Sequence, residues 1–433
     1  MSARSRLDAF SRLLAQLRQR LDLSFGFVLW DGATVPADLP ADALAVAIAD
    51  EGVVAALLRR PNVDTLANLW VSGRVDIRNG SIFDLVAARP AVRSKALLKG
   101  LGKGALLRTL APFLLLPRGG PFPLEKVRGD KAPVDGSAAS NQSNVSYHYD
   151  VSNRFYALFL DPAMVYTCAY FRDWDNDLAT AQHDKLDMVC RKLRLKPGER
   201  LLDIGCGWGA LVCHAARHYG VRAVGVTLSV EQADLARARV AREGLSDLVT
   251  IEVRDYAAME GPFDKISSIG MFEHVGIDNH PAYFKAVNRL LRPGGLYLHH
   301  AITRPAKRDD RAFRKGAREY AALVRYIFPG GELDHIGMSA ANLQRFGFEV
   351  HDIEGWREHY ARTCRIWHDN LRARLPEAEA EVGSVTTRLW LAYLAGCSLA
   401  FERNTVGIYQ TLASKRVKGP AELPSTRADL YRD

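Results

Sequence analysis

Short apolar runs alternate with amphipathic segments from about residue 200 to residue 302. The runs predict buried strands at Leu201–Ile204, Ala223–Thr227, Val249–Val253, Lys265–Ile269 and Leu296–Ile302. The segments between them carry apolar residues at helical spacing and predict helices at Ala210–His218, Val230–Glu243 and Ala282–Leu291. This alternation predicts an α/β fold with a mainly parallel, doubly wound sheet covered on both faces. Ligands of such sheets bind beyond the carboxyl ends of the strands.

Residues 1–120 follow a different pattern and predict a small α+β accessory domain. Leu7–Leu21 is amphipathic; the predicted strands are Ser24–Trp30 and Gly73–Arg78, and the predicted helices are Ala41–Arg59 and Val63–Val71. Residues 121–146 are predicted to be a linker, because most of them are small or polar. Residues 147–433 then form the second domain.

The C-terminal part interrupts the strand and helix alternation. Residues 303–382, with a charged helix predicted at Lys307–Arg318, are expected to form an insertion over the strand ends. The apolar segment Val385–Ala413 predicts one long buried helix or two short ones.

Composition narrows the possible classes of protein. No run approaches the length of an apolar bilayer span, and no signal peptide is recognisable. Six cysteines show no metal-ligand spacing, so we expect reduced thiols in the cytoplasm and no metal. The net charge is +9.

The basic charge is concentrated in residues 85–124, which contain no acidic residue. Lysines and arginines alternate there with leucines, a pattern typical of a segment lying on an anionic membrane surface. The alternative is a solvated helix packed on the next domain. Nucleic acid is a less favoured partner, because Phe113 and Phe122 are the only aromatic residues and no binding module is recognisable.

A glycine-rich stretch, Leu201–Gly209, links the first predicted strand to its helix. Its glycines stand at 205, 207 and 209, so it lacks both the phosphate-loop ending and the dinucleotide spacing. It resembles motif I of the class I S-adenosylmethionine-dependent methyltransferases. This resemblance implies that the amides of Gly205, Gly207 and Gly209 meet the cofactor and that Asp203 orients the loop or the ligand.

Two further strand ends are candidates for the same cofactor. Thr227 and Leu228, with Gln232, follow the second strand, where such folds hold the ribose. Asp255 and Tyr256 follow the third strand and are placed to bind and cover the adenine.

A more specific resemblance extends over about residues 140–416. The sequences that carry it are Tyr147–Tyr156, Leu160–Phe171, Ile269–Gly276, Phe328–Leu333 and His359–Trp367. They resemble the cyclopropane-fatty-acyl-phospholipid synthase family, to which the mycolic acid cyclopropane synthases are related. The resemblance implies a seven-stranded methyltransferase fold and transfer of a methylene from S-adenosylmethionine to a cis double bond of a phospholipid acyl chain.

The resemblance also implies the site residues. A bicarbonate ion, expected as the base, would be held by Cys168, Glu273, His300, the Ile302 amide and Tyr360, and Tyr166 and Thr167 would touch the cofactor. His299 competes with His300; His300 is preferred because it lies two residues before Ile302 and therefore on the same strand face.

Other functions remain open. A fatty-acyl C-methyltransferase would leave a branched, methylidene or hydroxylated product. A small-molecule N- or O-methyltransferase would not need the apolar helices or the basic stretch, and a third alternative is a non-catalytic lipid-binding protein. We expect a peripheral protein on the inner face of the membrane, with a homodimer as the candidate oligomeric state.

Overall fold

The computed structural model describes all residues except 1, 89–102, 127–150, 316–326, 328–330 and 432–433. It divides into two compact units, Met1–Arg128 with Gly383–Ala395, and Gly129–Val382 with Gly396–Asp433. The predicted division at 120 and 147 did not include the grouping of residues 383–395 with the N-terminal unit. Most of the predicted linker lies outside the described residues.

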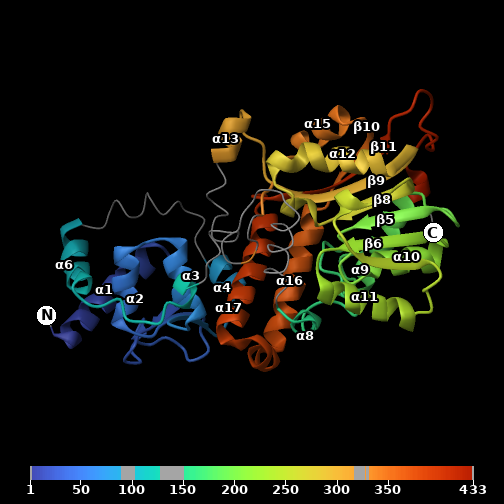
Figure 1. The fold of residues 1–433 in the computed structure, drawn as a ribbon. Coiled ribbons are helices and arrows are strands. Elements are labelled where there is room, and N and C mark those ends of the chain that lie inside the picture. Colours follow the sequence, from blue (N-terminus) through green and yellow to red (C-terminus); the bar gives the residue numbers. More distant parts are fainter. Residues whose placement is uncertain (1, 89–102, 127–150, 316–326, 328–330, 432–433) are drawn as a thin grey trace. The chain divides into compact units, whose positions relative to one another are not determined.

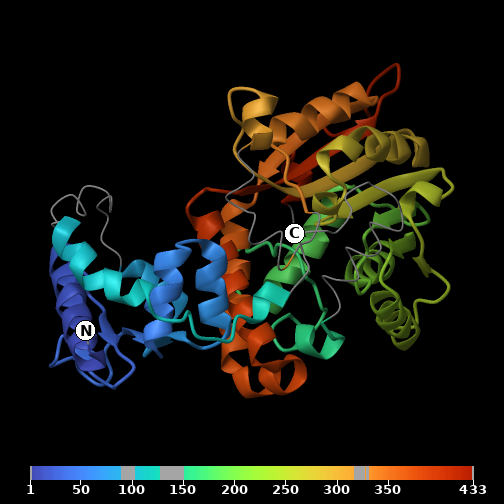
Figure 2. The same ribbon diagram turned by 60° about the vertical axis from the view of Figure 1, so that its left-hand side comes forward.

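The N-terminal unit contains a four-stranded sheet in the order β2-β1-β3-β4. Its elements are α1 (Ala3–Arg20), β1 (Gly26–Val28), β2 (Thr34–Val35), β3 (Ala45–Ile48), α2 (Glu51–Arg59), α3 (Val63–Val71), β4 (Val75–Arg78), α4 (Ile82–Ala87), α6 (Lys103–Leu114) and η1 (Pro123–Lys126). Helix α6 lies beside α1 and α2 (Figures 1 and 2), and its Phe113 is buried against Phe10 of α1. The prediction of a helix over Ala41–Arg59 was wrong in its first part, which forms β3.

The second unit is built on a seven-stranded sheet in the order β10-β11-β9-β8-β5-β6-β7. Strands β5 to β9 pair in parallel, whereas β11 pairs antiparallel with both β9 and β10. The strands are β5 (Arg200–Ile204), β6 (Arg222–Thr227), β7 (Val249–Val253), β8 (Phe263–Ile269), β9 (Leu291–Thr303), β10 (Phe348–Gly355) and β11 (Gly407–Lys415). The prediction of a mainly parallel α/β sheet is confirmed.

Helices cover both faces of this sheet, as Figure 1 shows. One core contains Leu201 together with residues of α9 (Leu178–Lys192), α10 (Ala210–Tyr219) and α11 (Val230–Arg242). The other contains Leu202 with residues of α12 (His280–Leu290) and α15 (Ile336–Arg345). Consecutive residues of one strand thus enter opposite cores, as the pleat requires.

The remaining elements of this unit are short, apart from two helices. They are α8 (Asn153–Ala157), η3 (Tyr256–Ala258), η4 (Phe272–His274), η5 (Ile277–Asn279), α13 (Asp310–Lys315), α16 (Arg357–Ala373), η7 (Ala428–Leu430) and both ends of α17 (Leu375–Glu402), whose residues 383–395 belong to the first unit. Helix α17 is broken at Gly383, where φ is 80°. The predicted helix over Val385–Ala413 was therefore wrong at its end, because β11 begins at Gly407. Among the described residues, no helix combines the length and the apolar character that a bilayer span needs.

Candidate active site

The glycine loop between β5 and α10 brings bare backbone to the carboxyl end of the sheet. Gly205 has a φ of 80°, and a Cβ there would lie 2.9 Å from Met271 Cβ. Gly209, with a φ of 79°, caps α10, and its Cβ would lie 3.1 Å from Ala236 Cβ. Gly207 has open space around it. A side chain is thus excluded by neighbouring atoms at the first position, whereas Gly207 is open to a ligand.

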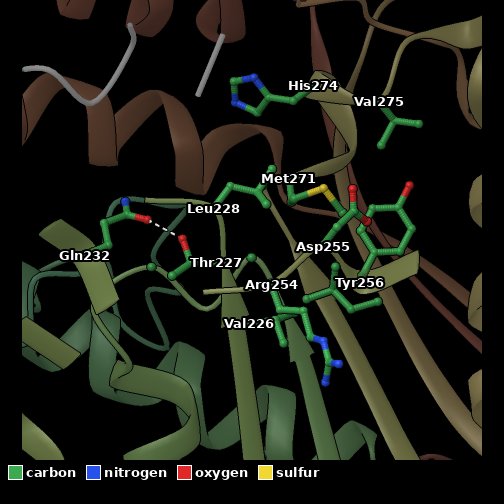
Figure 3. Close-up of a pocket in the computed structure, with 14 residues that line it drawn as sticks. Val226, Thr227, Leu228, Gln232, Arg254, Asp255, Tyr256, Met271, His274 and Val275 are labelled. Carbon is green, nitrogen blue, oxygen red and sulfur yellow. Dashed lines mark hydrogen bonds between the residues drawn. The ribbon is translucent and has the colours of Figure 1, made fainter. Parts of the chain in front are cut away.

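A pocket opens directly beyond this loop (Figure 3). It is lined by Ile204, Gly205, Gly207, Val226, Thr227, Leu228, Gln232, Arg254, Asp255, Tyr256, Gly270, Met271, His274 and Val275. The strand-end residues predicted for the ribose and the adenine therefore share one cavity.

A second pocket shares Gly205, Gly207, Gln232 and Gly270 with the first. The predicted residues Tyr166, Thr167 and Asp203 line it. Gly209 lines neither of these two pockets, and its contact with Ala236 indicates a role in packing α10 against α11.

The predicted ribose residues are held by each other. The Thr227 hydroxyl donates to Gln232 Oε1 at 2.9 Å and accepts from the Ser229 amide at 3.2 Å (Figure 3 shows the first bond). The Asp255 carboxylate accepts from the Ala257 amide at 2.8 Å, which caps η3 and fixes the position of Tyr256 beside it. These bonds fix the side chains before a ligand binds.

Lys185 of α9 lines the second pocket and was not predicted from the sequence. It is buried, and its Nζ donates to Thr167 Oγ1 at 2.9 Å. Burial lowers the pKa of Lys185 to about 8, and burial raises the pKa of Asp203 to about 6. A lysine within an amphipathic helix predicts a solvated side chain, so the sequence carries no signal for this role.

Glu273 and Ile302 are joined directly. The Ile302 amide donates to Glu273 Oε1 at 2.6 Å, whereas Glu273 Oε2 is buried and has no hydrogen-bond partner among the described residues. Burial raises the pKa of Glu273 to about 7. One carboxyl oxygen is therefore used to hold β9, and the other is available to a ligand.

His300 is held by a buried polar relay. Gln410 Nε2 lies 3.1 Å from His300 Nδ1, and Gln410 Oε1 accepts from Lys192 Nζ at 2.7 Å. Because the lysine can only donate, the amide must turn its oxygen to Lys192 and donate through nitrogen to His300 Nδ1. The proton of the neutral imidazole is then on Nε2, a buried atom with no partner in the described part of the chain. Burial lowers the pKa of His300, which favours this neutral form.

Trp356 connects the other predicted catalytic residues to this cluster. Its ring lies 5.3 Å from that of His300, and its carbonyl accepts from the Tyr360 amide at 3.1 Å. The buried Cys168 thiol lies 3.8 Å from the same carbonyl. Burial raises the pKa of Tyr360, and the proximity of Cys168 and Glu273 raises it further. Segments far apart in sequence thus meet in one region.

Comparison with known proteins gives a consistent result. Residues 137–411 match the family described as mycolic acid cyclopropane synthetase. The chain is 40% identical to a probable fatty acid methyltransferase of Pseudomonas putida, over 97% of this chain and 100% of that protein. It is 39% identical to the cyclopropane-fatty-acyl-phospholipid synthase of Escherichia coli, over 63% of this chain and 67% of that one.

Solved structures of similar proteins point to the same family as the sequence comparisons. The cyclopropane synthase MmaA2 from Mycobacterium tuberculosis is 33% identical, with a TM-score of 0.61 over 66% of this chain and 100% of that chain. Mycolic acid cyclopropane synthase CmaA1, complexed with SAH and CTAB, is 36% identical, with a TM-score of 0.60 over 63% of this chain and 98% of that chain. The predicted class I fold is confirmed, and this chain belongs to the mycolic acid cyclopropane synthetase family of S-adenosylmethionine-dependent methyltransferases.

Proposed function

We propose that this enzyme adds a methylene to the cis double bond of an unsaturated phospholipid acyl chain and forms a cyclopropane ring, with bicarbonate as the base. The observation that carries the proposal is a pair of buried atoms, Glu273 Oε2 and His300 Nε2, for which the described part of the chain provides no hydrogen-bond partner. One is an acceptor and the other a donor, as a bicarbonate with both a hydroxyl and charged oxygens requires. The Ile302 amide already donates to Glu273, so we infer that it holds the ion through that carboxylate.

S-adenosylmethionine, when bound, supplies an electrophilic methyl group. The chain's own residues would hold it along the two adjoining pockets, with Thr227 and Gln232 at the ribose and Asp255 and Tyr256 at the adenine. An alkene is a weak nucleophile, so proximity and exclusion of water must supply much of the acceleration.

Aromatic rings extend from the cofactor pocket to the proposed base site. Tyr166 lines the second pocket, and its ring lies 5.1 Å from that of Trp367, which in turn lies 6.0 Å from that of Tyr360. Electron-rich ring faces stabilise a nearby cation. We infer that these rings stabilise positive charge on the acyl chain until Glu273 and His300, through the bound ion, allow a proton to leave.

The second candidate is a fatty-acyl C-methyltransferase with a branched product. It is favoured by the P. putida relative, which matches 97% of this chain and is named a probable fatty acid methyltransferase. The two candidates share the cofactor, the acyl substrate and the fold, and differ in how the positive charge is removed.

Product analysis separates them. The full-length enzyme is incubated with S-adenosylmethionine and vesicles of unsaturated phospholipid, in bicarbonate-free buffer and with bicarbonate added back. Cyclopropane formation predicts a gain of one methylene, resistance to hydrogenation and dependence on bicarbonate. A branched saturated product carries two further hydrogens and needs a hydride donor, so a parallel incubation contains NADPH. Glu273→Gln is expected to bind the cofactor normally but to lose turnover by orders of magnitude; normal turnover would contradict the assigned role.

We propose further that the N-terminal unit contacts an anionic membrane surface. Leu107 and Leu115 are 66% and 88% exposed, next to the arginines Arg108 and Arg118. Apolar side chains flanked by basic ones bind anionic interfaces. Part of the basic stretch, 89–102, lies outside the described residues. The homodimer and the location at the inner face of the membrane stay predictions.

A further inference from the structure

Three histidines gather on two neighbouring helices, and none of them lines either cofactor pocket. His183 lies on α9, and His214 and His218 lie one turn apart on α10. The ring centroids of His214 and His218 are 4.5 Å apart, and that of His183 lies 5.1 Å from His214. One nitrogen from each residue lies within 4.8 Å of the other two. This arrangement brings three imidazoles to one point.

The central histidine lacks an adequate partner in this arrangement. His214 is 8% exposed, and its Nε2 is buried without a hydrogen bond among the described residues. Asp187 Oδ1 lies 3.9 Å away, too far for a hydrogen bond, and it already accepts from the Tyr219 hydroxyl at 2.5 Å. A buried imidazole nitrogen without a partner costs free energy, and a bound ion offsets that cost.

We propose that His183, His214 and His218 form a binding site for a divalent transition-metal ion, for which zinc is the probe. Imidazole is a preferred ligand of zinc, and three histidines leave a fourth position for water. Histidines one helical turn apart present their nitrogens on the same side of a helix.

The three histidine nitrogens need to approach one another only slightly to bind a metal ion. Ligands of a tetrahedral zinc ion lie about 3.4 Å apart when each is about 2.0–2.1 Å from the metal. His183 and His218 are exposed and can turn their rings toward the buried His214.

Asp187 is suited to support the site without binding the metal. Its carboxylate is fixed by Tyr219 and by Arg191 Nε, which donates to Oδ2 at 2.5 Å. Its negative charge, 3.9 Å from His214 Nε2, would stabilise a cation bound at that nitrogen. A metal bound here would join α9, which carries Lys185 of the cofactor pocket, to α10, which begins at the glycine loop.

The test uses untagged full-length protein after removal of metals with a chelator. Calorimetric titration with zinc chloride is expected to show one saturable site per chain. Bound zinc is also expected to raise the midpoint temperature of thermal unfolding. His183→Ala and His218→Ala should each weaken zinc binding about 10-fold or more. His351→Ala removes an imidazole from β10, outside the cluster, and should leave zinc binding unchanged.

A second readout keeps the proposal testable if a variant folds poorly. Cobalt bound to the wild-type chain is expected to give the visible absorption of a four-coordinate site with nitrogen ligands, which zinc displaces. Absence of saturable binding would overturn the proposal. So would equal zinc affinity in the wild type and in both cluster variants.

Discussion

Glu273 is buried with its two oxygens in different environments, and its burial determines how the residue responds to pH. Oε1 accepts from the Ile302 amide, while Oε2 is buried without a partner in the described residues. Burial raises the pKa of Glu273 from 4.5 to about 7. Between these values the unfolded chain loses its proton first, so the folded state binds more protons and its stability falls as the pH rises.

We therefore expect Glu273→Gln to stabilise the ligand-free fold increasingly as the pH rises from 5 to 8. The variant lacks the cost of ionising a buried carboxyl group, which amounts to about 3 kcal/mol above pH 7. Urea unfolding of both proteins at the two pH values measures the difference. The nearby Asp334, whose pKa is raised to about 7, acts in the same direction, because removing the Glu273 charge eases its ionisation. A difference in unfolding free energy that does not change with pH would contradict this assignment.

In the proposed mechanism Gln410 is a positioning residue, because it contacts His300 rather than the substrate. Gln410→Glu replaces the donor facing His300 Nδ1 by an acceptor and so favours the other tautomer. We expect turnover to fall about 10- to 100-fold, with the KM for the cofactor nearly unchanged. Steady-state kinetics separate the two parameters. Gln344→Glu makes the same change on the exposed face of α15 and should leave both parameters unchanged; an equal loss in the two variants would point to a general effect of charge.

The sequence indicated the polar groups that stand at strand ends but not those that support them. The alternation of side chains along a strand separates His299, whose ring lies 4.6 Å from that of Phe272, from His300, which faces Trp356 and Gln410. Gln410 lies on a strand that was predicted as helix, so its partner could not be found. Such contacts depend on which distant strands pair with each other, and the local pattern of apolar and polar residues does not contain that information.

At the scale of elements, the glycine loop is where we expect local geometry to affect cofactor binding most directly. Gly205→Ala would place a Cβ 2.9 Å from Met271 in a left-handed conformation that L residues rarely adopt. We expect the affinity for S-adenosylmethionine to fall about 10-fold or more, because the loop must move. Gly244→Ala is the matched control. The φ of Gly244 is 67°, and apart from its two chain neighbours no described residue has an atom within 4 Å of the position that a Cβ would take.

Calorimetric titration with the cofactor compares the two glycine variants. Both carry the strain of a left-handed alanine, so both should lose some stability, about 1 kcal/mol. If Gly244→Ala also lost cofactor affinity, general destabilisation would explain the result. If Gly205→Ala bound normally, close packing at the loop would not be needed for binding.

The misassigned elements share a physical cause. The run Ala45–Ile48 forms the short strand β3, and Gly407–Lys415 forms β11, which lies between β9 and β10. Short apolar runs have no periodicity that distinguishes a strand from a helix. The strands from β5 to β8 were predicted because glycines and amphipathic helices separate them, whereas β11 directly follows a long apolar helix.

At the scale of the whole molecule, the charge of +9 and the exposed leucines of α6 and the residue after it predict membrane binding. The full-length protein should sediment with vesicles of anionic phospholipid at low salt and dissociate as salt is added, because added ions screen charges beyond about 10 Å. Arg108→Ala combined with Leu115→Ser should weaken this binding about 10-fold or more, since each basic residue contributes about 1 kcal/mol at such a surface.

The control is Arg78→Ala with Leu66→Ser, which changes an exposed arginine on β4 and an exposed leucine on α3. This double variant should bind as the wild type does. Equal sedimentation with neutral vesicles would contradict an electrostatic contact, and equal loss in the two double variants would remove α6 from it.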